Sequence, residues 1–119
     1  MPRRLVDIAL HIQEMDLTAA PELAQHQIRS VVNRAYYAAY LTARAFCNDN
    51  GYSGVGASHE KIVDALCRQQ EWGKQGKQLQ QMKELRHQAD YRWHNDMTPR
   101  DARKCLRTCS EIIEAISKT

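Results

Sequence analysis

The densest group of chemically active side chains lies between residues 83 and 94. It combines cations, imidazoles, a carboxylate, a phenol and an indole: Lys83, Arg86, His87, Asp90, Tyr91, Arg92, Trp93 and His94. An arginine holds a phosphate through paired hydrogen bonds and stabilises the charge that develops in phosphoryl transfer. A histidine moves a proton near neutral pH, and aromatic rings stack on unpaired bases. The segment therefore has the residue types that bind RNA or a nucleotide and act on its phosphate.

A structural interpretation fits the same residues. Tyr91 and Trp93 can cover the end of a helix bundle, while Arg86 pairs with Asp90 one helical turn later. Residues 74–107 carry nine basic and four acidic side chains, in a chain whose formal net charge is +3. Such a local excess is also common on solvated helix faces. By composition alone, the structural interpretation is favoured.

A second polar group lies earlier in the chain. Its members are separated by four, four, three and four residues: Arg29, Asn33, Tyr37, Tyr40 and Arg44. These spacings place all five on one face of a helix. An asparagine and two phenols suit hydrogen bonding between helices or packing in a dimer, as well as contact with a ligand. The spacing leaves these alternatives open.

No pattern predicts a metal or a cofactor. Cys105 and Cys109 are four residues apart, but both fall on an apolar stripe, which predicts buried, reduced thiols that are neither ligands nor nucleophiles. The glycines of residues 51–56 fit neither a Gly-x-Gly-x-x-Gly fingerprint nor a P-loop, so we interpret this segment as a connector. For His59, at the start of a helix, capping and packing are favoured over anion binding.

The elements that must position these residues are helical. Apolar residues recur at helical spacing in five segments: residues 5–12, 21–48, 59–69, 79–91 and 98–116. Asp16–Ala20 reads as a break in which Thr18 caps the next helix, and Gly73 and Gly76 are expected to bracket a turn. We predict one all-α domain over residues 1–119, folded as an antiparallel bundle of four to five helices.

The size of the chain and its N-terminus bear on partners and location. A helical chain of 119 residues can bury only one small hydrophobic core, and such chains often complete that core by dimerising. We therefore expect a homodimer. Small residues on the second helix would let another helix approach closely: Ala35, Ala38, Ala39 and Ala43. No stretch approaches the about 20 apolar residues of a membrane span, and the N-terminus lacks a continuous apolar signal core. We therefore expect a cytoplasmic protein that does not bind membranes.

Two of these segments are similar to a known family. Arg29-Ser-Val-Val-Asn-Arg-Ala-Tyr-Tyr-Ala-Ala-Tyr-Leu-Thr-Ala-Arg44 resembles the second-helix signature of HEPN domains, and Leu85-Arg-His-Gln-Ala-Asp-Tyr91 resembles their later Leu-Arg-x-x-Ala-Asp-Tyr motif. The resemblance covers roughly residues 20 to 117, with both motifs in the family's order. Two motifs in order are more specific than either would be alone.

The resemblance implies a small helical bundle that forms a homodimer and is often encoded beside a minimal nucleotidyltransferase antitoxin in toxin–antitoxin or phage-defence systems. Many members are metal-independent ribonucleases with a composite site across the dimer. In the family pattern an arginine and a polar residue are followed, after four to six residues, by a histidine. The implied reaction is attack of the RNA 2′-hydroxyl on its own phosphate.

Carried over residue by residue, the resemblance assigns catalysis to Arg86, which stabilises the phosphate, and to His94 or His87, which moves the proton. Residues that would shape an RNA or nucleotide site are Asn33, Tyr37, Asp90, Tyr91 and Arg92. The position five after Arg86 is Tyr91, and His94 comes after seven intervening residues. Because of that departure, an alternative is a non-catalytic dimer that docks a nucleotidyltransferase or another defence protein, with Arg29, Asn33, Tyr37 and Arg44 at the interface.

Overall fold

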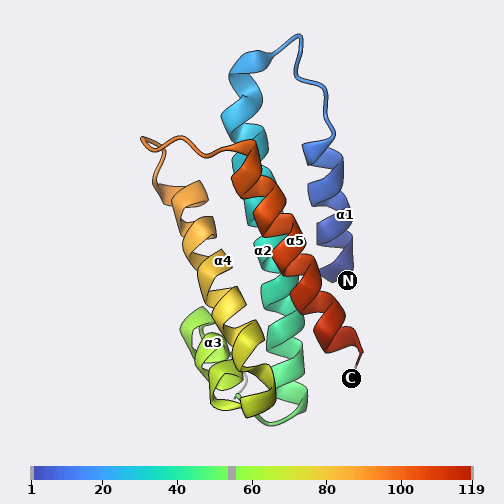
Figure 1. The fold of residues 1–119 in the computed structure, drawn as a ribbon, viewed down its shortest axis with the longest axis vertical. Coiled ribbons are helices and arrows are strands. Elements are labelled where there is room, and N and C mark those ends of the chain that lie inside the picture. Colours follow the sequence, from blue (N-terminus) through green and yellow to red (C-terminus); the bar gives the residue numbers. More distant parts are fainter. Residues whose placement is uncertain (1, 54–55, 119) are drawn as a thin grey trace.

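A computed structural model describes residues 2–53 and 56–118 of the chain (Figure 1). Within them lie five α-helices and no strand: α1 (Pro2–Gln13), α2 (Ala24–Asp49), α3 (His59–Arg68), α4 (Gly73–Tyr91) and α5 (Pro99–Ser117). Single 3-10 turns at Pro21–Leu23 and Gln70–Trp72 lead into α2 and α4. Part of the predicted connector, residues 54–55, is outside the described residues. The all-helical prediction is confirmed.

The long helix α2 is the centre of the bundle and packs against each of the other four helices. Its alanines are fully buried, as their size predicts: Ala35, Ala38, Ala39 and Ala43. Helices α1, α2, α4 and α5 run alternately up and down, and the short α3 lies beside the lower half of α4 (Figure 1). The predicted antiparallel arrangement is therefore correct.

The start of α5 follows directly from its sequence. The Thr98 hydroxyl accepts a hydrogen bond from the Asp101 backbone N–H at 3.2 Å, and the Asp101 carboxylate accepts one from the Thr98 N–H at 2.8 Å. This reciprocal pair satisfies two donors that would otherwise be unpaired at a helix end. The apolar stripe behind it is buried: Ala102, Cys105, Leu106, Cys109, Ile112, Ile113 and Ile116.

Two local predictions are wrong. Gly73 and Gly76 do not bracket a turn, because α4 begins at Gly73 and runs through Gly76. Thr18 does not cap the following helix, because its hydroxyl and its backbone N–H both bond the carboxylate of Asp16. Both predictions came from the local preferences of glycine and threonine. Gly76 instead lies at a close contact between two helices, and Thr18 bonds a neighbouring carboxylate.

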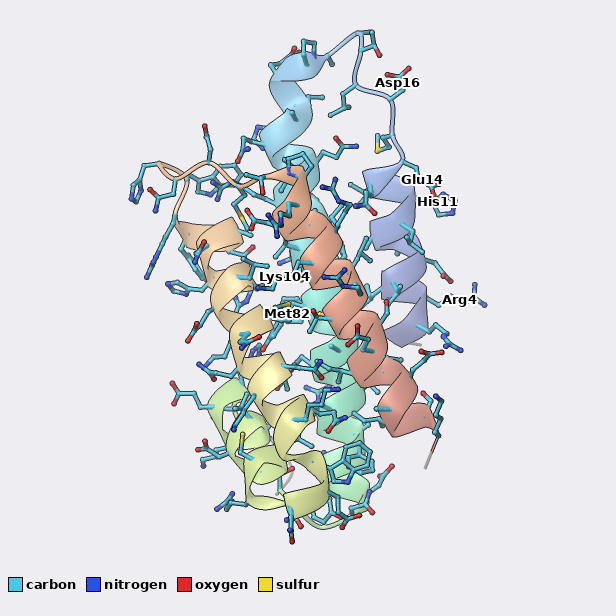
Figure 2. The ribbon with its side chains drawn as sticks, in the orientation of Figure 1. Arg4, His11, Glu14, Asp16, Met82 and Lys104 are labelled. Atoms are coloured by element: carbon cyan, nitrogen blue, oxygen red, sulfur yellow. The ribbon has the colours of Figure 1, made fainter. Side chains whose placement is uncertain are left out.

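One continuous core joins all five helices. Met82 of α4 points between α4 and α5 in Figure 2 and is almost fully buried, whereas Arg4, His11 and Glu14 line the outer side of α1. All four cysteines are free thiols, of which Cys67 alone is exposed. Burial raises the pKa of Cys47 and keeps its thiol protonated. No helix of the described ranges is long and apolar enough to cross a membrane.

Candidate functional site

Helices α2 and α4 bring three of the predicted site residues into one polar network. Arg86 Nη1 donates to Asp90 Oδ2 at 3.3 Å, one turn along α4. From α2, Asn33 Nδ2 donates to Asp90 Oδ1 at 3.2 Å and to Oδ2 at 3.3 Å. The carboxylate of Asp90 therefore holds both partners, and Arg86 has a fixed position with most of its N–H donors left over.

Two tyrosine rings of α2 pack against the guanidinium of this arginine. The Arg86 Cζ lies 5.4 Å from the ring centroid of Tyr36 and 5.7 Å from that of Tyr37. A guanidinium at this distance over an aromatic face is held by the negative potential of the ring. Arg86 Nε is buried and has no hydrogen-bond partner among the described residues. Tyr37, one of the predicted site residues, thus lies next to Arg86.

His59 approaches the same two rings from α3. Its ring centroid lies 5.7 Å from that of Tyr36 and 5.9 Å from that of Tyr37, and it stacks on Tyr40 at 3.8 Å. Its Nδ1 makes a hydrogen bond of 2.7 Å with the Tyr36 hydroxyl. The ring is therefore held on two sides, while no hydrogen bond to Nε2 is found within the described residues.

The electrostatic surroundings keep His59 neutral. Burial lowers the pKa of His59, and the nearby positive charges of Arg86, Lys83 and Arg44 lower it further. Burial also raises the pKa of Tyr36 above its usual range, so its hydroxyl stays protonated. In the tautomer of neutral His59 that carries its proton on Nδ1, the Tyr36 hydroxyl oxygen accepts a hydrogen bond from Nδ1–H and Nε2 has a free lone pair. In this tautomer His59 can take up a proton at Nε2.

A cationic hollow of about 380 Å³ opens beside this network on the outer side of α4. It is lined by one acidic residue and several basic or polar ones: Gln80, Lys83, Glu84, Arg86, His87 and Arg92. Lys83 also reaches Glu60 of α3, with 3.7 Å between Nζ and Oε1. A hollow with this lining and Arg86 in its wall suits a phosphate.

The family model of the HEPN domain matches residues 13–119. The chain belongs to the HEPN family. This confirms the resemblance drawn from residues 29–44 and 85–91, and it indicates a role related to RNA or nucleotides in defence or toxin–antitoxin systems. No curated protein and no solved structure matches the chain. Apart from Gln13, helix α1 precedes the matched residues.

In this HEPN chain, the segment after α4, which carries His94, is bonded to α2. Residues 92–97 are tied to α2, because Arg29 donates to the carbonyls of Arg92 and Asn95 and the Gln25 amide bonds both the N–H and the carbonyl of Met97. His94 is exposed and has no hydrogen bond, ion pair or ring contact with Arg86 among the described residues.

Other predicted residues lie at the edge of the site. His87 is exposed on the rim of the hollow, with its ring centroid 4.9 Å from that of Tyr91, and Tyr91 is itself exposed. Of the alternatives left open for the polar face of α2, Arg29 makes hydrogen bonds between helices. It is only 3% exposed and bonds carbonyls at the end of α4. An interface role for Arg29 is therefore wrong.

Tyr36 was not among the predicted site residues, and for His59 the prediction favoured packing, which its contacts with the tyrosine rings show. Tyr36 and His59 are 23 positions apart and meet because Ser58 caps α3, whose first residue then faces α2. Ser58 Oγ accepts the Lys61 N–H at 3.4 Å and so caps the start of α3. A signal was present in the Tyr36 and Tyr40 pair, one turn apart, but nothing in the spacing connects it to His59.

The lowered pKa of His59 predicts a pH effect on stability. Unfolding restores the pKa to about 6.5, so the unfolded chain binds the proton more tightly than the folded chain does. The free energy of unfolding therefore falls as the pH drops below about 6.5 through the lower folded pKa. We expect urea unfolding to show a smaller loss between pH 7.5 and 5 in His59→Gln than in wild type.

The control is His11→Gln on the exposed face of α1, which retains His59 and is expected to follow wild type. Equal acid losses in His59→Gln and wild type would contradict a lowered pKa of His59.

Proposed function

We propose that this HEPN protein is the RNA-acting component of a toxin–antitoxin or phage-defence module in the cytoplasm, and that it cleaves RNA without a metal ion. The observation that carries the proposal is the placement of Arg86 and His59 over the same two rings, Tyr36 and Tyr37. A fixed cation and a neutral imidazole are the two groups that cleavage of an RNA phosphodiester needs.

In the proposed reaction the RNA 2′-oxygen attacks the adjacent phosphorus. His59 Nε2 takes the proton of the 2′-hydroxyl as the bond between O2′ and phosphorus forms. Arg86 stabilises the negative charge on the non-bridging oxygens. The bond between phosphorus and O5′ then breaks, and the 5′-oxygen takes a proton from water. The products are a 2′,3′-cyclic phosphate and a 5′-hydroxyl, and the protonated His59 returns its proton to solvent.

The other residues of the site have supporting roles in this proposal. Asp90 and Asn33 orient Arg86 through the hydrogen bonds of their network. Lys83 and Arg92 attract the RNA backbone to the hollow, because both line it and both are cations. His87 lines the same hollow and His94 lies in the next segment, so each is a competing candidate for the proton transfer.

The test is cleavage of end-labelled structured RNA and tRNA in EDTA. We expect Arg86→Ala to lower the rate about 10²- to 10³-fold and His59→Gln to lower it by at least about 10²-fold. His87→Gln and His94→Gln are expected to cut like wild type. The matched controls are Arg68→Ala on α3 and His11→Gln on α1, both exposed and outside the network.

Several outcomes would contradict parts of the proposal. Unchanged cleavage by Arg86→Ala would remove the site assignment. Loss of cleavage in His87→Gln or His94→Gln, with His59→Gln active, would move the proton transfer to that histidine. Products without a 2′,3′-cyclic phosphate would exclude attack by the 2′-hydroxyl.

We also propose that the protein acts as a homodimer and pairs with a minimal nucleotidyltransferase antitoxin. The resemblance to HEPN toxins and the small core of the chain support the dimer. Sedimentation equilibrium of the purified protein tests it, and a monomer at micromolar concentrations would count against it.

The exposed position of His94, with no contact to Arg86 among the described residues, favours a second candidate, the docking module. Of the interface residues first considered, Arg44 is exposed, whereas Arg29 is buried. This candidate expects no cleavage by folded protein, and loss of nucleotidyltransferase binding in Arg44→Ala. Retained binding in that variant would oppose it.

A further inference from the structure

A second hollow, of about 240 Å³, adjoins the network at Asn33 and Asp90. Its wall includes Trp93 from the segment after α4, Arg34 and Asn33 from α2, and Asp90 from the end of α4. We propose that this hollow binds a guanine base, which stacks on Trp93. The inference rests on the proposed function and deepens it, since it names the base that the RNA presents beside Arg86.

Trp93 is exposed and yet held in place. Its side chain is 52% exposed, an unusual fraction for an indole in a small helical protein. Its Nε1–H donates to the Asp90 carbonyl at 3.2 Å, and the Arg29 Cζ lies 4.5 Å from its ring centroid. The His26 ring lies 5.3 Å away at an angle of 52°. The indole is therefore ordered before any ligand arrives, which lowers the entropy cost of stacking.

The residue that packs behind Trp93, Arg29, is itself held in place. Arg29 is buried and bonds backbone carbonyls of α4 and of the segment that follows it. Its guanidinium packs on the indole as a fixed cation. An exposed aromatic ring backed in this way is a stacking platform, and base stacking on such a ring strengthens binding about 5- to 150-fold.

The polar groups of the hollow select among bases. Arg34 donates one N–H to Asn33 Oδ1 at 3.0 Å, which leaves four donors on an exposed guanidinium. Asp90 is an acceptor only, and its three bonds from Asn33 and Arg86 leave one lone pair, on Oδ1, open. Guanine offers two neighbouring acceptors, O6 and N7, to an arginine. Its N1–H or N2–H₂ can donate to the open lone pair of Asp90, whereas the only ring donor of uracil is flanked by carbonyls.

The position of this hollow relates it to the proposed cleavage. Asp90 contributes to its wall and also accepts a hydrogen bond from Arg86 at 3.3 Å. A base held by Asp90 is thus one side chain away from the group that stabilises the phosphate. When a guanine occupies this hollow, a phosphate attached to the same guanosine would lie beside Arg86.

The experiment measures binding without cleavage. Fluorescence anisotropy follows labelled 2′-O-methyl pentaribonucleotides, which lack the attacking hydroxyl, with one central guanine, adenine or cytosine among uracils, or uracil alone. We expect the guanine oligonucleotide to bind about tenfold or more tightly than the all-uracil one. Trp93→Leu is expected to lose most of this advantage and Trp93→Phe to restore part of it. Arg34→Gln is expected to reduce guanine preference more than overall affinity.

The control Arg68→Ala removes an exposed cation of α3 and is expected to keep the guanine preference. Circular dichroism and a denaturation midpoint show that each variant folds. Equal affinity for all four oligonucleotides, or a Trp93→Leu protein that binds like wild type, would overturn the inference. A guanine preference in a protein that cleaves nothing would leave this site standing and remove the ribonuclease proposal. Cleavage without a preference would do the reverse.

A parallel titration with guanosine 5′-monophosphate separates two sources of the base. Tighter binding of the mononucleotide than of the pentaribonucleotide would support a guanine site that serves free nucleotides. The opposite order would support a site for guanine within RNA.

Discussion

The Arg29→Ala protein is expected to lose about 2–5 kcal/mol of its free energy of unfolding, as two carbonyls lose their partner. Arg29 is 3% exposed, and its Nη1 donates to the carbonyls of Gln88 and Ala89 at 2.8 and 3.1 Å. Its Nη2 donates to the carbonyls of Arg92 and Asn95, at 3.2 Å for the former. Helix α4 therefore ends on a guanidinium that bonds its last carbonyls, among them that of Ala89, at a helix end where carbonyls lack partners within the helix.

The cost of removing this side chain has two physical parts. The partial negative charge at the end of α4 favours a cation, so that the buried charge is stabilised by the helix that it caps. Without the guanidinium, the carbonyls of Ala89 and Asn95 lose their hydrogen-bond partner, whereas those of Gln88 and Arg92 keep a backbone N–H. Each buried unsatisfied group costs about 1–3 kcal/mol. Trp93 also loses the side chain on which it packs.

Urea unfolding at neutral pH measures this effect. Arg34→Ala, five residues further along the same helix and exposed, is the matched control and is expected to change stability by less than about 0.5 kcal/mol. Arg29→Lys retains the charge but not the forked donors, so an intermediate loss is expected. A loss in Arg29→Ala no larger than that in Arg34→Ala would contradict the capping role.

Arg29 also illustrates how far the sequence predicts this fold. Apolar periodicity located all five helices, because a helix that buries one face must repeat apolar residues at its own period. The polar stripe of α2 was harder to interpret, since periodicity shows that a face is polar but not what covers it. Helix α4 and the segment after it cover the part of that stripe that contains Arg29.

For the candidate site, as for the fold, the sequence predicts contacts within a helix but not those between helices. Arg86 and Asp90 are one turn apart, so their contact follows from helix geometry. The contact of Asn33 with Asp90 spans 57 positions and depends on how α2 and α4 pack, which the family motifs imply but no spacing encodes. The bond between Tyr36 and His59 depends in addition on the placement of α3. Contacts between helices therefore required the structure.

The second large effect is expected at Gly76, where alanine should destabilise the protein by about 1–3 kcal/mol. In an exposed helix, the same change would stabilise by about 0.5–1 kcal/mol, because glycine costs more backbone entropy. Here α4 packs directly on α3. A Cβ at Gly76 would lie 2.6 Å from Cys67 Sγ, 2.9 Å from the Cys67 backbone nitrogen and 3.2 Å from Leu66 Cβ.

The backbone contact decides the sign of the Gly76 effect. The sulfur of Cys67 can rotate away, but its nitrogen belongs to α3, so that the two helices themselves must separate. Gly73→Ala is the matched control, since Gly73 has helical angles and nothing within 4 Å of its added Cβ. It is expected to stabilise by about 0.5 kcal/mol. Thermal and urea unfolding of the two variants should therefore shift in opposite directions. A stabilised Gly76→Ala protein would show that the close approach of α3 and α4 is not what requires glycine at this position.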